Sequence, residues 1–156
     1  MSSMTDAPEP ALSDAFHVFD TTLRDGAQRE GINLTVADKL TIARHLDDYG
    51  VGFIEGGWPG ANPRDTEFFQ RARAEIDFRH AQLVAFGATR KAGVRVEDDP
   101  QVTALLESQA PVVTLVAKSH VRHVELALRT TRRRTSRWCG TPSRTCARRP
   151  PGLPGL

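Results

Sequence analysis

The stretch FHVFDTTLRDGAQREG, residues 16–31, joins a short apolar run to a long polar loop. We expect the run Phe16–Phe19 to form a buried strand that ends at the polar loop Asp20–Gly31. A dinucleotide-binding sheet needs a Gly-x-Gly-x-x-Gly turn after its first strand. The turn at this place reads DTTLRDG, so the sequence does not carry the Rossmann motif where that fold requires it.

Helix-like and strand-like patterns alternate along the chain beyond this loop. Residues 35–49 have apolar side chains at helical spacing, with Thr35 as a candidate N-cap, Asp38 three residues later and Gly50 as the C-cap glycine. The alternation predicts right-handed βαβ units and a parallel sheet. The further predicted elements are, in order, strand 51–54, a helix that starts at Pro63 and covers 65–75, strand 82–86, helix 99–108, strand 111–116 and helix 120–128.

The fold class that these elements predict is α/β, in the form of a partial TIM (β/α)8 barrel. An open doubly wound sheet shows the same alternation, but the missing glycine motif argues against it. A complete barrel takes about 250 residues, and the chain has 156. We therefore predict that residues 14–130 form about the first four βα units of a barrel domain.

The composition changes abruptly at Arg129. Residues 1–128 carry 13 Lys+Arg and 19 Asp+Glu, a net charge of −6, whereas residues 129–156 carry eight Arg and no acid, a net charge of +8. We predict that residues 1–13 are a mobile leader and that residues 131–156 are a disordered tail outside the domain. Both cysteines lie in this tail, at a spacing that does not fit a zinc site.

The sequence shows no sign of membrane insertion or secretion. No run approaches the roughly 18 apolar residues that a membrane-spanning helix needs. The first ten residues, MSSMTDAPEP, have neither a basic region nor an apolar one, as a signal peptide would. We therefore expect a cytoplasmic location and no membrane partner.

Three charged residues follow or end the first two predicted strands. Arg24 and Asp25 come after the first strand, and Glu55 ends the second. The carboxyl ends of parallel strands meet at one edge of a sheet, with neighbours about 4.8 Å apart, so we expect these side chains to meet. Together they can bind a divalent cation, hold a substrate carboxylate and orient the guanidinium. The other interpretation is a structural ion-pair cluster.

Other candidates have weaker support. Thr114 and Lys118 lie at the end of the fourth strand and could reach the same pocket. The pair Gly56-Gly57 is interpreted as a turn with unusual dihedral angles, or else as a close approach of substrate to the backbone. His120 and His123 are three residues apart on a predicted helix, a spacing more typical of a solvated face than of a metal site.

Two strings of this chain resemble the citramalate-synthase branch of a known enzyme family. They are FDTTLRDGAQREG, residues 19–31, and FIEGGWPGANPRDTEFF, residues 53–69, and the resemblance covers about residues 16–128. The family also contains isopropylmalate and homocitrate synthases and hydroxymethylglutaryl-CoA lyase. The resemblance implies a barrel that condenses acetyl-CoA with pyruvate, or another 2-keto acid, in branched-chain amino-acid biosynthesis, and a homodimer for the intact protein.

The resemblance also implies roles for single residues. Arg24 would bind the keto-acid carbonyl and stabilise the developing alkoxide, Glu55 would hold Arg24, and Gln28 would line the substrate pocket, beside which Thr114 is a candidate. Asp25 would be a ligand of a divalent metal, Mg²⁺, Mn²⁺ or Zn²⁺, which polarises the ketone. The family's His-x-His ligands are absent from this sequence, so the metal site is incomplete and we expect the chain to be inactive as it stands.

The basic tail also departs from this family, which continues with an acidic helix. Residues 133–143 can be written in codons whose neighbouring frame encodes Glu-Glu-Asn-Leu-Ala-Met-Val-Arg-Asp-Thr-Val, so we interpret the tail as a frameshift product. The alternative is a non-catalytic protein whose arginines bind nucleic acid. Trp138 is the only aromatic residue of the segment and the rest of the chain is acidic, so we expect no nucleic-acid partner. Within the family, 2-isopropylmalate synthase or a related lyase remains the alternative activity.

Overall fold

The computed structural model describes residues 16–91, 93–118, 120, 122 and 124–125. The predicted leader, the predicted tail with both cysteines, and His123 lie outside the described residues. The elements in chain order are β1 (Phe19–Asp20), the 3₁₀ turn η1 (Gly26–Gln28), α1 (Val36–Asp48), β2 (Phe53–Gly57), α2 (Pro63–Glu75), β3 (Gln82–Ala88), the 3₁₀ turn η2 (Val96–Asp98), α3 (Pro100–Glu107) and β4 (Val112–Val116).

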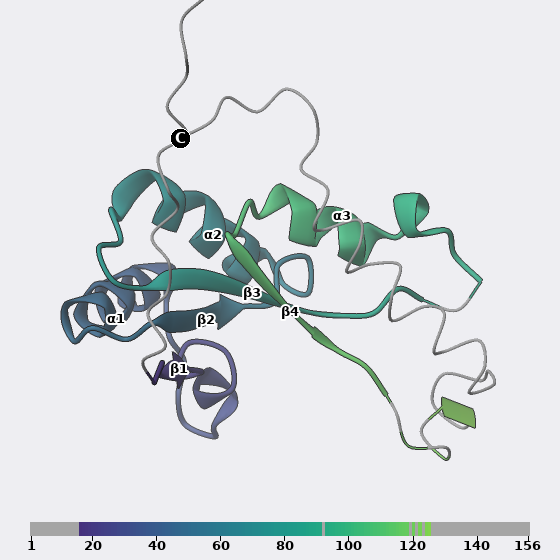
Figure 1. Cartoon of the computed structure of the whole chain (residues 1–156), viewed down its shortest axis with the longest axis horizontal. Coiled ribbons are helices and arrows are strands. Elements are labelled where there is room, and N and C mark those ends of the chain that lie inside the picture. Colours follow the sequence, from purple (N-terminus) through teal and green to yellow (C-terminus); the bar gives the residue numbers. More distant parts are fainter. Residues whose placement is uncertain (1–15, 92, 119, 121, 123, 126–156) are drawn as a thin grey trace, which may run out of the picture.

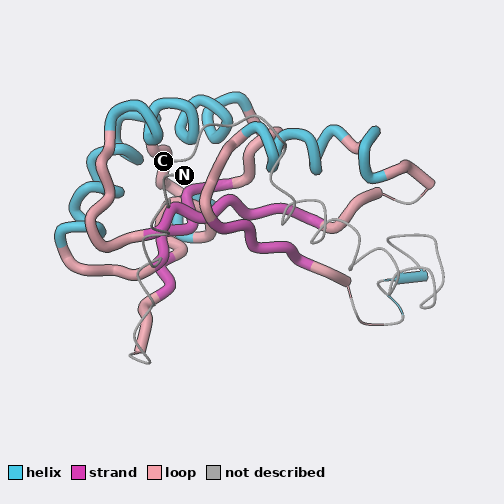
Figure 2. Tube along the Cα trace, turned by 45° about the horizontal axis from the view of Figure 1, so that its top comes forward, coloured by secondary structure: helices cyan, strands magenta, loops and turns pink. Residues whose placement is uncertain are grey.

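The four strands form one parallel sheet in the order β1-β2-β3-β4. Each strand lies beside the next one in sequence, so crossovers of one hand place every helix on the same face. Figures 1 and 2 show α1, α2 and α3 along one side of the sheet. A doubly wound sheet would reverse its strand order and carry helices on both faces. The predicted α/β class and partial barrel are therefore confirmed.

The hydrophobic core lies between the sheet and the three helices. Alternate residues of the strands point into it, and their neighbours point to the opposite, open face. Gly56 is needed at the contact of β2 with α2, because a Cβ atom there would lie 2.5 Å from the Phe68 ring. The core cluster includes Leu40 of α1, Ile54 of β2, Phe68 and Phe69 of α2, Leu83 and Ala85 of β3, and Leu105 of α3.

Two strands differ from the sequence-based expectation. The predicted buried strand Phe16–Phe19 is wrong: pairing is limited to Phe19 and Asp20, and Phe16 is 91% exposed. This strand is at the edge of the described sheet, so its apolar side chains lack the second covering layer that the expectation assumed. β2 begins later than predicted, and Glu55–Gly57 belong to the strand because a bulge between Glu55 and Gly57 extends its pairing with β3.

The helices agree closely with the expectation. Thr35 and Asp38 form a capping box at the start of α1, and Gly50 after its end has φ +80°. Pro63 opens α2 as its first residue. Most of the predicted helix 120–128 lies outside the described residues, although the Val124 amide donates to the His120 carbonyl at 3.0 Å, as in a helix.

A buried carboxylate joins α1 to the start of β3. Asp47 is almost completely buried and accepts hydrogen bonds from the amides of Arg79, His80 and Ala81 at 3.0, 2.9 and 2.7 Å. Burial alone would raise the pKa of Asp47, but these three donors together hold its pKa below the ordinary value. The carboxylate therefore stabilises the fold only while it is ionised.

The first prediction concerns acid stability. The lowered pKa of Asp47 means that its contribution is complete above the unfolded-state pKa of about 3.9 and is lost as the pH falls through the folded-state value. Asp47→Asn should lower the free energy of unfolding at neutral pH by about 1–3 kcal/mol. Urea denaturation followed by circular dichroism should show this difference shrinking in acid, and an undiminished difference there would contradict the assignment.

Candidate functional site

Arg24 and Glu55 form the centre of the candidate site. The Arg24 Nε donates to Glu55 Oε2 at 2.7 Å, and Nη2 lies 2.7 Å from the same oxygen. Glu55 is 1% exposed and the Arg24 side chain is 20% exposed. Burial of a carboxylate requires a strong donor, and among the described residues Arg24 supplies it.

The loop after β1 brings Arg24 to this position. The Asp20 carboxylate accepts from the amide and the hydroxyl of Thr22, and the Thr21 carbonyl accepts from the amides of Arg24 and Gly26 at 3.1 and 3.0 Å. These bonds close a tight turn at the carboxyl end of β1. The turn sends the Arg24 side chain across to β2 and leaves Asp25 facing the outside.

An aromatic pair forms the floor beneath the guanidinium. The Arg24 Cζ lies 4.2 Å from the centroid of the Phe86 ring, a cation–π contact. Phe86, in β3, meets the Trp58 indole edge to face, with centroids 5.3 Å apart and planes at 80°. The guanidinium is therefore held by Glu55 in its plane and by Phe86 on its face.

Asp25 and Gln28 lie beside Arg24 at the solvent. Asp25 is 64% exposed, and its Oδ1 is 3.1 Å from Arg24 Nη1. Asp25 and Gln28 both line an open hollow of about 590 Å³ over the loop that follows β1. A smaller hollow of about 220 Å³ is lined by Arg24 and Gln28 on one side and by Trp58 on the other. A small anionic molecule can enter here and reach the guanidinium.

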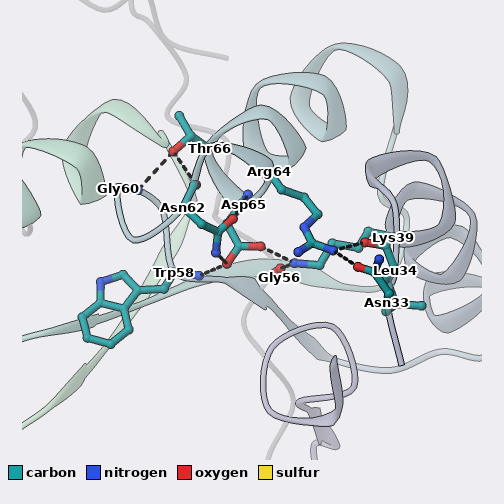
Figure 3. A network of polar contacts seen from close by, with 10 residues as sticks. All are labelled: Asn33, Leu34, Lys39, Gly56, Trp58, Gly60, Asn62, Arg64, Asp65 and Thr66. Atoms are coloured by element: carbon teal, nitrogen blue, oxygen red, sulfur yellow. Dashed lines mark hydrogen bonds and ion pairs between the residues drawn. The ribbon is translucent and has the colours of Figure 1, made fainter. Parts of the chain in front are cut away.

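A second charged cluster lies next to the first, between α1, β2 and α2 (Figure 3). Lys39 Nζ is 2.5 Å from Asp65 Oδ1 and donates to the Gly56 carbonyl at 2.9 Å. The Asp65 Oδ2 accepts from the Trp58 amide at 2.9 Å and from the Asn62 side chain at 3.1 Å. The turn between β2 and α2 is therefore fixed by side chains of both helices.

The structure brings together the three charged residues that the strand ends suggested. Thr114 pairs in register with Phe86 and so lies on the same sheet face as the aromatic floor, but no hydrogen bond in the described part joins it to the charged residues. Lys118 is exposed beyond β4. Gly57 has φ +148°, and a Cβ atom there would lie 2.6 Å from the Asp65 carboxyl carbon, which favours the structural interpretation of the Gly56-Gly57 pair.

Three residues of the site are missed by sequence reasoning. Lys39 carries a signal, because it falls between Val36 and Ala43 at helical spacing and is thus on the apolar stripe of α1. A charged residue on such a stripe must be buried with a partner. Phe86 and Trp58 carry no comparable signal, because their roles depend on which residues of other elements stand opposite them.

The described residues do not by themselves form a metal centre. Among residues 16–91, 93–118, 120, 122 and 124–125, no three His, Cys, Asp or Glu side chains are grouped so as to hold an ion. Asp25 offers one exposed carboxylate, one oxygen of which already contacts Arg24. A divalent ion needs several oxygen or nitrogen ligands, so Asp25 alone does not complete a metal site.

Comparison with known proteins gives the family. The sequence profile of the HMGL-like family matches residues 15–138. The chain belongs to the HMGL-like family. This confirms the resemblance carried by the two strings, which both lie inside the matched segment.

The relatives within this family include several citramalate synthases. The chain is 82% identical over 120 residues to "(R)-citramalate synthase" of Streptomyces coelicolor, and 48% identical over 120 residues to the protein of that name from Aquifex aeolicus. Each match covers 77% of this chain and 22% of the relative. A "2-isopropylmalate synthase" of Thermosynechococcus vestitus is 39% identical over 124 residues, which are 79% of this chain and 22% of that protein. The chain thus spans about a fifth of the length of the curated relatives that it matches.

Within the described residues, no helix has the length and apolar character needed to cross a bilayer. The longest described helices, α1 and α2, have 13 residues each, and a spanning helix needs about 20.

The second prediction concerns the energy of the Arg24–Glu55 contact. A double-mutant cycle of Arg24→Met and Glu55→Gln should give a coupling energy of about 1.5–3 kcal/mol, because hydrogen bonds to charged groups in a buried setting are strong. The matched control is Arg71–Glu75, which has the same chemistry and the same 2.7 Å distance at the solvent-exposed surface of α2.

Urea denaturation of the four proteins in each cycle measures both couplings. The exposed Arg71–Glu75 pair should show almost none, since water screens it. Equal couplings in the two cycles would contradict the view that burial of Glu55 gives the site its rigidity.

Proposed function

We propose that this chain carries part of the active site of a citramalate-synthase-type acyltransferase, which condenses acetyl-CoA with pyruvate to give citramalate and CoA. The observation that carries the proposal is the buried Arg24–Glu55 pair with Asp25 beside it, in a chain 82% identical over 120 residues to a citramalate synthase. The product is a branched-chain precursor, so the reaction belongs to branched-chain amino-acid biosynthesis, in the cytoplasm, and the intact protein is proposed to act as a homodimer.

Arg24 is the residue proposed to bind the keto acid. Its guanidinium has five N–H donors, more than its contacts with Glu55 and Asp25 use. The remaining donors can bind the carbonyl oxygen of the 2-keto acid. When the enolate of acetyl-CoA attacks the carbonyl carbon of the 2-keto acid, negative charge develops on the carbonyl oxygen. A donor that is already held in place stabilises this charge without reorganisation.

Glu55 and Gln28 are proposed to support this step in different ways. Glu55 is 1% exposed, and its contact with Arg24, its partner among the described residues, fixes the plane of the guanidinium. Gln28 lines both hollows next to Arg24 and offers an amide donor and acceptor to the substrate carboxylate. Thr114, on the face of Phe86, is proposed to contact the substrate from the β4 side.

Asp25 remains a proposed ligand of the divalent metal of the intact enzyme. The further ligands have to come from outside the described residues. Hydrolysis of the citramalyl thioester then releases CoA and draws the condensation forward. The alternative activity is that of a 2-isopropylmalate synthase, which would use a bulkier 2-keto acid in the same step. The similarity to the relative from Thermosynechococcus vestitus supports this alternative.

The third prediction tests these roles in a chimera. Residues 16–118 of this chain would replace the matching segment of the Streptomyces coelicolor relative, a conservative exchange at 82% identity. In this chimera Arg24→Ala should lower kcat by about 10²–10³, the loss typical of one donor to a developing oxyanion. Asp25→Ala should abolish turnover, and the exposed Arg71→Ala should leave it unchanged.

CoA release from acetyl-CoA with pyruvate or with 2-ketoisovalerate measures the outcome, and formation of acetyl-CoA and acetoacetate from hydroxymethylglutaryl-CoA tests the lyase alternative. Preference for pyruvate supports the proposed reaction, and preference for one of the other two substrates would replace it. Near-normal turnover of either site variant would refute the role given to that residue.

The fourth prediction concerns the 156-residue chain itself. It should release no CoA from acetyl-CoA with pyruvate in excess Mg²⁺ or Mn²⁺, and calorimetry should detect only weak metal binding, since the described part supplies one candidate carboxylate. Apolar side chains of the open face, such as Phe19 and Val116, are exposed, so size-exclusion chromatography should show self-association. Steady keto-acid-dependent CoA release would contradict this expectation.

A further inference from the structure

Lys39 is a buried lysine that reaches from α1 to the carboxyl end of β2. It is 3% exposed, and its ammonium group donates to the Gly56 carbonyl of β2 at 2.9 Å, lies 2.5 Å from Asp65 Oδ1 of α2 and lies 5.3 Å from the centroid of the Phe68 ring. Gly56 is the residue directly after Glu55. The ammonium group thus binds the backbone one peptide away from the buried carboxylate of the candidate site.

Asp65 connects Lys39 to the turn that follows β2. Its second oxygen accepts the Trp58 amide at 2.9 Å, and its carboxyl carbon occupies the space that a Cβ atom of residue 57 would need. The carboxylate therefore packs directly against the backbone of Gly57. Because α2 carries Asp65 in its first turn, the helix fixes the position of the Trp58 backbone (Figure 3).

Trp58 connects the turn to Arg24. Its indole contacts Phe86 edge to face at 5.3 Å, and Phe86 supports the guanidinium at 4.2 Å. An unbroken series of contacts therefore runs from Lys39 through Asp65, Trp58 and Phe86 to Arg24. Each contact in this series is a hydrogen bond, an ion pair or a ring contact.

We propose that Lys39 and Asp65 form a positioning pair that holds the β2–α2 turn so that Trp58 and Phe86 keep the Arg24 guanidinium in its binding orientation. The proposal rests on the function proposed for Arg24. Neither Lys39 nor Asp65 needs to touch a substrate, and their effect on the site is exerted through the aromatic floor.

A purely stabilising role explains the pair less well. Desolvation of two buried charges offsets most of their attraction, so apolar side chains of similar volume would stabilise the fold at least as well. Such side chains could not bind the Gly56 carbonyl or the Trp58 amide. Asp47, at the other end of the same helix, gives the contrast, because its three partners are at the amino end of β3, far along the strand from Phe86.

The test uses the 156-residue chain and two side-chain signals in ¹⁵N-labelled protein. One is the indole Nε1–H of Trp58, a buried atom with no hydrogen-bond partner in the described structure, and the other is the guanidinium Nε–H of Arg24, bonded to Glu55. Trp58→Phe and Arg24→Lys assign the two signals. Neither signal requires catalysis, so the result of this test is independent of the result of the CoA-release assays.

The informative variant replaces both members of the pair, Lys39→Met with Asp65→Asn, so that no unpaired charge is left buried and the chain can still fold. Asp47→Asn is the matched control, since it also removes a buried charge from the α1 interface. Circular dichroism and urea denaturation establish that both variants are folded. Lys39→Met alone is the harsher change, because it leaves the Asp65 charge buried without Lys39. This single variant is informative only if it also unfolds cooperatively in urea.

The expected result is that the double variant shifts and broadens both signals, with faster solvent exchange of the Arg24 Nε–H, while Asp47→Asn leaves both signals in place. Two results would overturn the proposal: unchanged signals in a folded double variant, or the same change in the Asp47→Asn control. The first would make the pair a local anchor with no effect on Arg24, and the second would make the effect a general consequence of lower stability.

Discussion

The close approach of α2 to β2 is the constraint on which the rest of this structure depends. It is possible only because residues 56 and 57 have no side chain: a Cβ atom would lie 2.5 Å from the Phe68 ring at the first position and 2.6 Å from the Asp65 carboxyl carbon at the second. The approach brings the first turn of α2 to the strand end. The bulge and the buried carboxylate of Glu55 lie at this same strand end.

The site is built from groups that each limit the freedom of the next. Glu55 lies on the face of β2 opposite to Ile54, which belongs to the helix-side core, and it is too deeply buried to be left without a donor. Arg24 meets this need, and its guanidinium contacts both the Glu55 carboxylate and the Phe86 ring. A guanidinium held in its plane by a carboxylate and on its face by an aromatic ring is prepared to bind before any substrate arrives.

Much of this could be predicted from the sequence, and the failures have physical causes. Helix limits followed from Thr35, Pro63 and Gly50, because caps and breakers act locally. The meeting of Arg24 with Glu55 followed from the rule that parallel strand ends share an edge. The first strand was misplaced because burial depends on neighbours that a local pattern does not contain. Phe86 and Trp58 could not be foreseen for the same reason.

The two buried charges of α1 define where that helix can sit. Its apolar stripe repeats about every turn, but a slide by four residues would put a charged side chain, Lys39 or Asp47, at the place of Ala43 in the core. The same slide would take Lys39 away from Asp65 and Asp47 away from the amides of residues 79–81. Apolar contacts thus hold α1 against the sheet, whereas the contacts of Lys39 and Asp47 fix its position along the helix axis. Variants in which the apolar side chains of α1 are shuffled should therefore keep a single docked position of the helix. Variants in which Lys39 and Asp47 are exchanged should not.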